Sequence, residues 1–257
     1  MDKFTRITGK WWFYAILVVM QFVLLPVATR NFSPEASGDI IWATLANAFQ
    51  VGMREYYLWF QITAIVMFVM LAALRGRMAK VFNIYVFVCY VVFAFVQNVA
   101  ITEKYGLSIV TVNVIMFLLV AYAWLREILH PANDYSFRDL KWSNAWMIVL
   151  SVVAFWAPLS GSQFDPSPMR LLDSGSSLAF CLMTPAFLTI MTLNIPSVNI
   201  GTYRVTAAVG TIIGLYNMMN FGNPHTYGLA ILHLPLLIIS LYCIIKSYFI
   251  PATGKTE

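Results

Sequence analysis

The chain has 257 residues, of which 60% are hydrophobic and only 11% carry a charge. Soluble domains carry charges on about a quarter of their residues, and a chain this short cannot hide so much apolar surface from water. The composition therefore predicts an integral membrane protein. It excludes a disordered chain, a disulfide-stapled secreted domain and a soluble nucleic-acid-binding protein.

Eight apolar stretches are long enough to cross a bilayer, because a helix needs about 20 residues to span the hydrocarbon core. In chain order they cover residues 11–29, 56–74, 81–100, 107–125, 144–160, 177–193, 203–220 and 227–249. The stretches are continuously apolar rather than alternating, which is typical of membrane helices. The sequence thus predicts an all-α, multi-pass membrane protein with eight transmembrane helices.

The distribution of Lys and Arg predicts the orientation of these helices. Eight spans put both termini on one side, and 12 of the 16 basic residues fall on that side. The other four are Arg30, Arg54, Lys104 and Arg170. The positive-inside rule then predicts cytoplasmic termini in a prokaryotic inner membrane. This asymmetry explains the net charge of +5 without a nucleic-acid partner.

Four pairs of sequence features recur in the same order in the two halves of the chain. The pairs are Lys10-Trp11 with Lys141-Trp142, Pro26 with Pro158, Asn31-Phe32-Ser33-Pro34 with Gln163-Phe164-Asp165-Pro166, and Tyr105-Gly106-Leu107 with Tyr227-Gly228-Leu229. They predict a duplication, with one four-helix repeat over residues 1–130 and a second over 131–257. Four spans per repeat give both halves the same orientation, related by an axis along the membrane normal.

The first repeat has about ten extra residues, and we expect them in an outer amphipathic helix over residues 39–54. Ser37-Gly38-Asp39 would cap its N-terminus. Polar and apolar residues recur at helical spacing on two opposite faces. The polar face would hold Thr44, Asn47, Gln50 and Arg54, and the apolar face Ile40, Ile41, Leu45 and Phe49. The alternative is a structured loop.

Polar residues gather at the outer ends of the third, fourth, seventh and eighth spans. If the halves repeat, both groups face the axis and form an outward-facing polar vestibule. The candidate substrate-binding residues are Gln97, Asn98, Glu103, Tyr105, Asn217, Asn220, His225, Tyr227 and His233. The alternative is that these side chains only cap helix ends at the membrane interface.

No charged residue lies in the middle of a predicted span, which argues against a proton-coupled pump or a voltage sensor. His233 is the one group that could titrate at membrane depth. A metal or haem site with His225 is not expected, because the third histidine, His130, lies on the opposite side. The three cysteines, Cys89, Cys181 and Cys243, lie in apolar spans without CxxC spacing and are expected to be small core residues. We therefore predict no metal and no cofactor.

Other polar residues within the spans are expected to face a neighbouring helix or a cavity, and Pro185 is expected to kink the sixth span. These polar residues are Gln21, Gln61, Asn113 and Thr184. Residues 173–177 are expected to cap the sixth span. A cation site at Asp165 and Asp173 has weak support, because calcium takes six to eight oxygen ligands.

No known catalytic signature is found, so no catalytic residue is predicted. The leading hypothesis is a protein that binds or transports a small neutral or amphiphilic solute through the vestibule between the two halves. The alternative is a non-transporting subunit that anchors a larger complex through the basic cytoplasmic loop 126–141. A third hypothesis is an enzyme that modifies outer-leaflet lipids with His225 and either Glu103 or Asp173.

Overall fold

The computed structural model describes residues 3–138, 140–160, 163–224 and 226–250. The structure is mostly helical, at 73%. In chain order the described α-helices are α1 (Lys3–Thr8), α2 (Trp11–Val23), α3 (Ser37–Ala46), α4 (Phe49–Gly52), α5 (Tyr57–Leu74), α6 (Ala79–Val96), α7 (Thr111–Leu129), α8 (Ala145–Trp156), α9 (Arg170–Asp173), α10 (Phe180–Leu193), α11 (Ile200–Met218) and α12 (Tyr227–Ser247). The 3-10 helices are η1 (Pro34–Ala36), η2 (Arg54–Tyr56), η3 (Arg75–Met78), η4 (Trp142–Asn144), η5 (Ser176–Leu178) and η6 (Met219–Gly222).

Each of the eight predicted apolar stretches overlaps one of the longer helices, but fewer qualify as membrane spans. Three described segments are long and apolar enough to cross a membrane: Arg54–Val96, Thr111–Leu129 and Tyr227–Ser247. A fourth candidate is the broken pair Arg170–Leu178 and Phe180–Leu193, whose parts meet at 88°. Helices α2 and α8, with 13 and 12 residues, are shorter than a full span. The predictions of eight spans and two repeats are therefore not confirmed.

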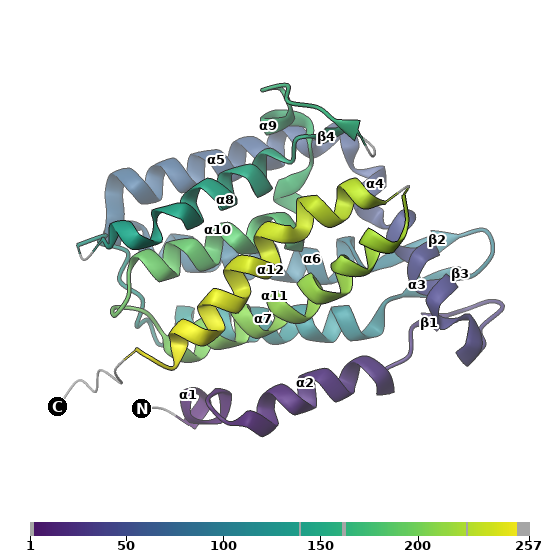
Figure 1. Cartoon of the computed structure of the whole chain (residues 1–257), viewed down its shortest axis with the longest axis horizontal. Coiled ribbons are helices and arrows are strands. Elements are labelled where there is room, and N and C mark those ends of the chain that lie inside the picture. The colour runs from purple at the N-terminus through teal and green to yellow at the C-terminus, as the bar shows by residue number, and fades with distance from the viewer. Residues whose placement is uncertain (1–2, 139, 161–162, 225, 251–257) are drawn as a thin grey trace.

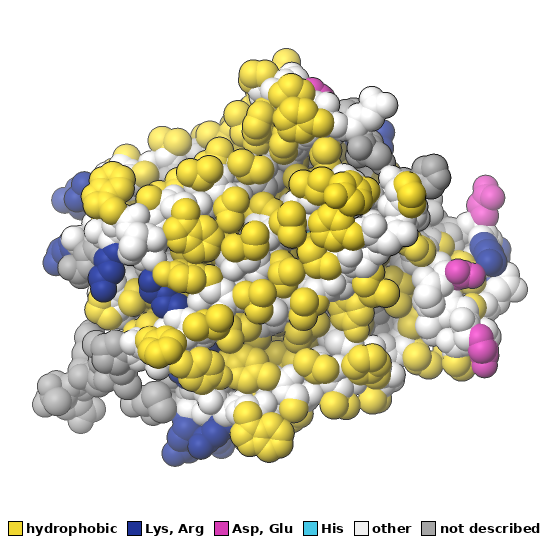
Figure 2. All heavy atoms as spheres, viewed as in Figure 1, with side chains coloured by type: hydrophobic (Ala, Val, Ile, Leu, Met, Phe, Trp, Pro, Cys, Tyr) yellow, Lys and Arg dark blue, Asp and Glu magenta, His cyan; other side chains and the backbone are white. Residues whose placement is uncertain are grey.

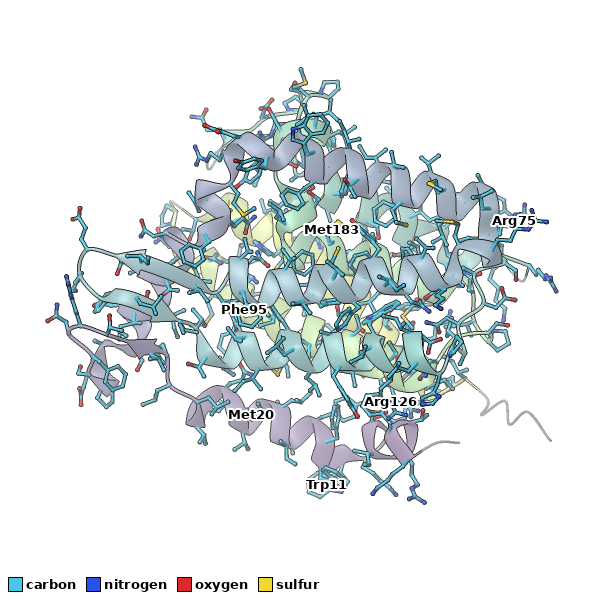
Figure 3. The ribbon with its side chains drawn as sticks, turned by 180° about the vertical axis from the view of Figure 1, so that it is seen from behind. Trp11, Met20, Arg75, Phe95, Arg126 and Met183 are labelled. Carbon is cyan, nitrogen blue, oxygen red and sulfur yellow. The ribbon has the colours of Figure 1, made fainter. Side chains whose placement is uncertain are left out.

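The segment Arg54–Val96 is a hairpin of two antiparallel helices rather than one long rod (Figure 1). The chain reverses at η3, where Arg75 has a φ of 53°. Figure 3 shows Arg75 at this turn, at the same end of the bundle as Arg126. Helices α5 and α6 have few direct contacts with each other, whereas α6 packs closely along α7. This separation becomes important at the candidate site.

Helices α10 and α11 form the interior of the bundle. All residues of α10 except Cys181 and Ile190 are buried. It packs against α8, α12 and α11, while α11 packs most closely along α12 and also against α7. Helices α2 and α5 lie at the edges (Figure 1). A helix that is apolar on all sides is expected at such a central position.

Aromatic rings join α6, α7 and α10 in the core. The Phe187 ring of α10 has its centroid 6.1 Å from that of Phe82 on α6 and 6.5 Å from that of Trp124 on α7. The Phe117 and Phe180 rings stack with centroids 4.1 Å apart. The buried Trp124 ring also needs a partner for its N–H, which it donates to Thr206 of α11 at 3.2 Å.

The outer surface of the bundle is apolar along its sides and charged at its ends. Figure 2 shows apolar side chains covering the visible side, with basic groups gathered at one end and acidic groups at the other. Trp11, Phe22 and Trp59 are among the large exposed hydrophobic residues. Helix α1 and the end of α12 lie at the basic end (Figure 1). Apolar sides of this kind are compatible with a membrane environment.

A small antiparallel sheet covers the opposite end of the bundle and was not predicted. Its strand order is β1 (Val27–Ala28), β3 (Gly106–Ile109) and β2 (Val99–Thr102), with Val27 and Val99 both paired to Ile109. The predicted first, third and fourth spans included these residues. Pro26 cannot continue α2, and pairing as strands satisfies backbone groups beyond the helix ends. A second hairpin pairs β4 (Leu159–Ser160) with β5 (Gln163–Phe164).

The segment predicted as one amphipathic helix is broken, and its faces agree with the prediction at Ile40 and Asn47 but not at Thr44 and Leu45. It consists of α3, α4 and η2, and Ala48 between α3 and α4 bridges to Ala100 of β2. Thr44 is buried against the sheet, where its hydroxyl lies 2.8 Å from that of Ser108, while Leu45 is exposed. Ser37-Gly38-Asp39 does not supply the cap, since the N-cap residue of α3 is Ala36.

Candidate ligand-binding cavity between α5 and α6

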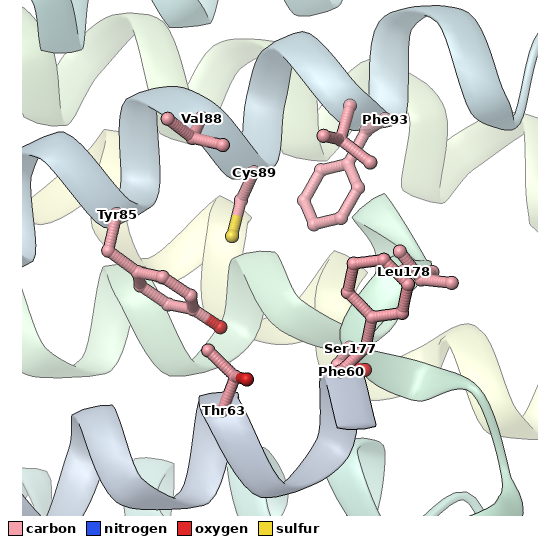
Figure 4. Close-up of a pocket in the computed structure, with 9 residues that line it drawn as sticks. Phe60, Thr63, Tyr85, Val88, Cys89, Phe93, Ser177 and Leu178 are labelled. Atoms are coloured by element: carbon pink, nitrogen blue, oxygen red, sulfur yellow. The ribbon is translucent and has the colours of Figure 1, made fainter. Parts of the chain in front are cut away.

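A cavity of about 200 Å³ lies between α5, α6 and η5 (Figure 4). Its lining residues are Phe60, Thr63, Tyr85, Val88, Cys89, Val92, Phe93, Ser177 and Leu178. An apolar cavity of about 150 Å³ can hold a benzene ring, so this one has room for a single ring or a short alkyl segment. The lining is predominantly apolar, as is usual for pockets that bind small organic molecules.

The cavity extends from the outer surface of the bundle into its interior. Thr63 and Val88 are exposed, whereas Cys89, Phe93 and Ser177 are buried. The entrance therefore lies on the apolar side of the molecule, between two candidate membrane helices. A ligand would reach it through the side wall rather than from either end.

A few polar atoms lie along this apolar lining. In Figure 4 the Cys89 sulfur and the Tyr85 and Thr63 hydroxyls face a common space. The Thr63 hydroxyl already donates to the backbone oxygen of Trp59 at 2.8 Å. The Ser177 hydroxyl is buried and, among the described residues, has no hydrogen-bond partner. Leaving such a group unpaired costs about 1–3 kcal/mol, which a ligand with a hydroxyl or carbonyl group would recover.

Gln61 of α5 holds one wall of the cavity in place. This side chain is fully buried, and its amide nitrogen, with two hydrogens to donate, lies 2.9–3.1 Å from the oxygens of Leu171, Ser174 and Ser176. Its amide oxygen accepts the backbone N–H of Ser177 at 2.8 Å. The prediction that Gln61 bonds a neighbouring segment is therefore confirmed.

Gln97, at the end of α6, holds the other side of the broken segment. Its side-chain oxygen accepts the backbone N–H of Phe180, the first residue of α10, at 2.7 Å. The short segment η5 is thus hydrogen-bonded to α5 and followed directly by a bond to α6. These bonds hold η5 between α5 and α6, which have few direct contacts with each other. The position of η5 therefore accounts for the cavity between the two helices.

Gly175 allows the sharp turn before η5. It has a φ of 68°, a conformation that favours glycine. A Cβ atom at this position would lie 2.5 Å from the Tyr57 ring. The turn therefore needs glycine both for its backbone angle and for the close approach of α5.

The break before α10 differs from the predicted cap and kink. The N-cap residue is Ala179, which offers no side-chain hydrogen bond, and residues 174–177 serve Gln61 instead. The 88° break precedes α10, whereas Pro185 lies inside the helix. Asp173 pairs with Arg170 at 2.8 Å rather than acting as a cap, and Asp165 lies 3.9 Å from the same arginine.

Three further predictions about polar residues can be compared with the structure. Asn113 donates to Asn98 at 2.9 Å and Thr184 lies 3.1 Å from the Tyr90 hydroxyl, so both link neighbouring elements as predicted. The Gln21 amide donates at 3.1 Å to Leu17 of its own helix, so this bond does not link neighbouring elements.

The residues predicted to form a vestibule lie around the sheet end of the bundle, and His225 falls outside the described residues. Gln97 and Asn217 both contact the start of α10, where the Asn217 amide lies 3.5 Å from the Cys181 sulfur. Asn98 is buried and donates to the end of its own helix, at Phe93 and Ala94. These bonds agree with the helix-capping alternative.

The remaining predicted residues do not join this group. Glu103 is exposed at the turn of the β2–β3 hairpin, and the Tyr105 ring beside it is buried. Asn220 donates to the backbone of Asn217 at 3.1 Å, and Tyr227 is half exposed. His233 bonds the Leu229 carbonyl of its own helix rather than another helix. None of these residues lines the α5–α6 cavity, and the vestibule stays a prediction.

The cavity residues were not predicted from the sequence, because the predicted site consisted of polar residues at helix ends. Phe60, Tyr85 and Val88 are ordinary apolar or aromatic residues of a membrane helix, and Cys89 was interpreted as a small core residue. The spacing Tyr85–Val88–Cys89 does put these three on one face of α6. Only the position of η5 makes that face a cavity, and a single sequence does not reveal it.

Comparison with known proteins supplies no relative: no family model, curated protein sequence or solved structure matches this chain. Among the described residues, no group of three or more His, Cys, Asp and Glu side chains is arranged to hold a metal ion. The structural class is that of a mostly helical protein with several apolar helices compatible with a membrane.

Proposed function

We propose that this chain binds a small neutral or amphiphilic molecule in the α5–α6 cavity and takes it up sideways from the bilayer. The observation that carries the proposal is the combination of an apolar entrance at Thr63 and Val88 with an unpartnered hydroxyl at Ser177 in the interior. A molecule with an apolar body and one hydrogen-bonding group complements both features.

The proposal includes a membrane protein with eight spans, both termini in the cytoplasm and two four-helix repeats. Several features support it. Pro26 and Pro158 each follow a helix end and precede a two-residue strand, β1 or β4. The last two long helices of each half, α6–α7 and α11–α12, form the most extensive helix contacts. The positions of α5 and α10 differ, since α5 lies at the edge and α10 in the interior.

Binding of a long-chain alcohol to the purified protein in detergent tests the cavity. The variant Thr63→Phe fills the entrance at an exposed position, so it should weaken binding by about tenfold or more without unfolding the protein. The matched control is Val66→Phe, on an exposed position of the same helix outside the cavity lining, which should bind as the wild type does.

The same measurement distinguishes the cavity from the predicted vestibule. Alanine at Asn217 and Tyr227 should leave alcohol binding unchanged if the α5–α6 cavity is the site. If these alanines reduce binding or proteoliposome uptake while Thr63→Phe does not, the vestibule is the site and the cavity proposal is wrong. Equal losses for Thr63→Phe and Val66→Phe would also contradict the proposal.

A further inference from the structure

A second, polar cavity lies at the opposite end of the α5–α6 hairpin from the sheet. Its volume is about 480 Å³, and its lining residues are Ala73, Leu74, Arg75, Gly76, Arg77, Asp134, Ser136 and Arg138. One wall is the turn between α5 and α6, and the other is the loop that follows α7. This site is separate from the cavity of the proposed function.

Positive charge dominates this cavity. It has three arginines and one aspartate, and among the described residues none of the three guanidinium groups makes an ion pair or a hydrogen bond. All three arginines are exposed at this end of the bundle. Exposed, unpaired guanidinium groups around one cavity are suited to an anion, because each presents several N–H donors to phosphate oxygens.

The loop that forms the second wall is held by buried polar groups. The Glu127 carboxylate at the end of α7 accepts the backbone N–H groups of Ala132 and Asn133, both at 2.5 Å. The Tyr135 hydroxyl accepts from the Asn133 side chain at 2.9 Å and donates to Asn83 of α6 at 2.8 Å. Burial raises the pKa of Tyr135 well above its usual value, so this donor stays protonated.

Two further bonds fix the loop against the segment between α10 and α11. The backbone N–H of Asp134 donates to Ser197 at 2.8 Å, and that of Phe137 donates to the Asn194 side chain at 2.8 Å. The Asp134 carboxylate also packs against Gly76, where a Cβ would lie 2.8 Å from its oxygen. The backbone of the loop is therefore held in place, and the exposed arginines extend from the turn and from this loop around the cavity.

We propose that this cavity binds the phosphate group of an anionic phospholipid. The three arginines are suited to a phosphate group. The apolar residues Ala73 and Leu74 on the last turn of α5 favour a phosphate that is attached to a lipid. Leu74 is exposed, as are Val69 and Met70 of the same helix, so an acyl chain would lie along this apolar surface of α5. Basic cavities between helices at the cytoplasmic side are typical sites for lipid headgroups.

The test is the affinity of the purified full-length protein for phosphatidylglycerol, measured by native mass spectrometry in detergent. The triple variant Arg75→Gln, Arg77→Gln and Arg138→Gln should bind it at least about tenfold more weakly. The matched control is Lys3→Gln, Arg6→Gln and Lys10→Gln, which removes three exposed charges at the same end outside the cavity and should retain binding.

Two more arms make the assignment specific. Asp134→Asn removes a negative charge that would repel the lipid phosphate, so it should strengthen phosphatidylglycerol binding. Zwitterionic phosphatidylcholine should bind weakly to every variant. Equal losses in the two triple variants would mean diffuse attraction and overturn the proposal. Binding of inorganic phosphate that depends on the three arginines, while lipid binding does not, would assign the site to a soluble phosphate compound instead.

Discussion

Ser176 and Ser177 are adjacent in the sequence, yet their hydroxyl groups have opposite roles. Ser176 donates to the backbone oxygen of Phe155 at 2.5 Å and bonds Gln61. Ser177 has a buried hydroxyl with no partner among the described residues, and it lines the α5–α6 cavity. Ser176 therefore forms structural hydrogen bonds, whereas the unpartnered Ser177 hydroxyl is the group that we propose as the ligand contact.

Replacing Ser177 by alanine should stabilise the empty protein by about 1 kcal/mol, because the substitution removes an unsatisfied buried hydroxyl. It should also weaken the binding of a long-chain alcohol by about tenfold and leave the binding of the matching alkane unchanged. Thermal unfolding in detergent and a binding titration measure the two effects.

The control is Ser176→Ala, which should instead destabilise the protein, since it leaves the Phe155 carbonyl without this donor. If Ser177→Ala lowers stability as much as Ser176→Ala does, the Ser177 hydroxyl has a structural partner and the proposed ligand contact fails.

At the scale of elements, the positions of the main helices were predicted from the long apolar stretches. An apolar run of this length favours a helix whatever segments pack against it. The strands around Val27, Val99 and Ile109 were not predicted, since their pairing depends on chain segments far apart in sequence. The break at Ala179 was missed for the same reason. The backbone N–H groups on either side of it are bonded by Gln61 and Gln97, which belong to two other helices.

Gln61 should therefore contribute strongly to the stability of this element. Gln61→Leu removes hydrogen bonds to three residues and leaves the Ser177 N–H unpaired, so we expect a loss of about 2–3 kcal/mol in the free energy of unfolding. Gln21→Leu is the matched control, because Gln21 bonds only its own helix among the described residues, and its loss should be below about 0.5 kcal/mol. Similar losses in a denaturant titration of the two variants would contradict the role given to Gln61.

At the scale of the whole molecule, the sides of the bundle are apolar, which is compatible with a membrane, and the placement of the charges predicts the orientation. The basic end carries η3, α1 and the end of α12, and the opposite end carries the sheet. The predicted vestibule residues lie near that sheet, but the cavity lies on the side of the bundle. The sequence could not reveal this, because the cavity exists only where η5 separates α5 from α6.

Cysteine labelling tests the orientation in a variant whose native cysteines are replaced. Glu103→Cys, at the hairpin turn of the sheet, should react with a membrane-impermeant maleimide in intact cells. Arg77→Cys, at the other end of α6, should react only after the membrane is opened. Labelling of both residues from the same side would contradict a membrane-spanning α6, and the reverse pattern would contradict cytoplasmic termini.

The central claim is that a ligand enters the α5–α6 cavity from the side. The most direct measurement is photolabelling in bilayers with a diazirine-bearing long-chain alcohol, followed by mapping of the labelled peptides. We expect labelling concentrated on residues 60–63 and 85–93 in the wild type, lost in Thr63→Phe and retained in Val66→Phe. Labelling spread evenly over the exposed faces of α2, α8 and α12, and unchanged by Thr63→Phe, would contradict the account.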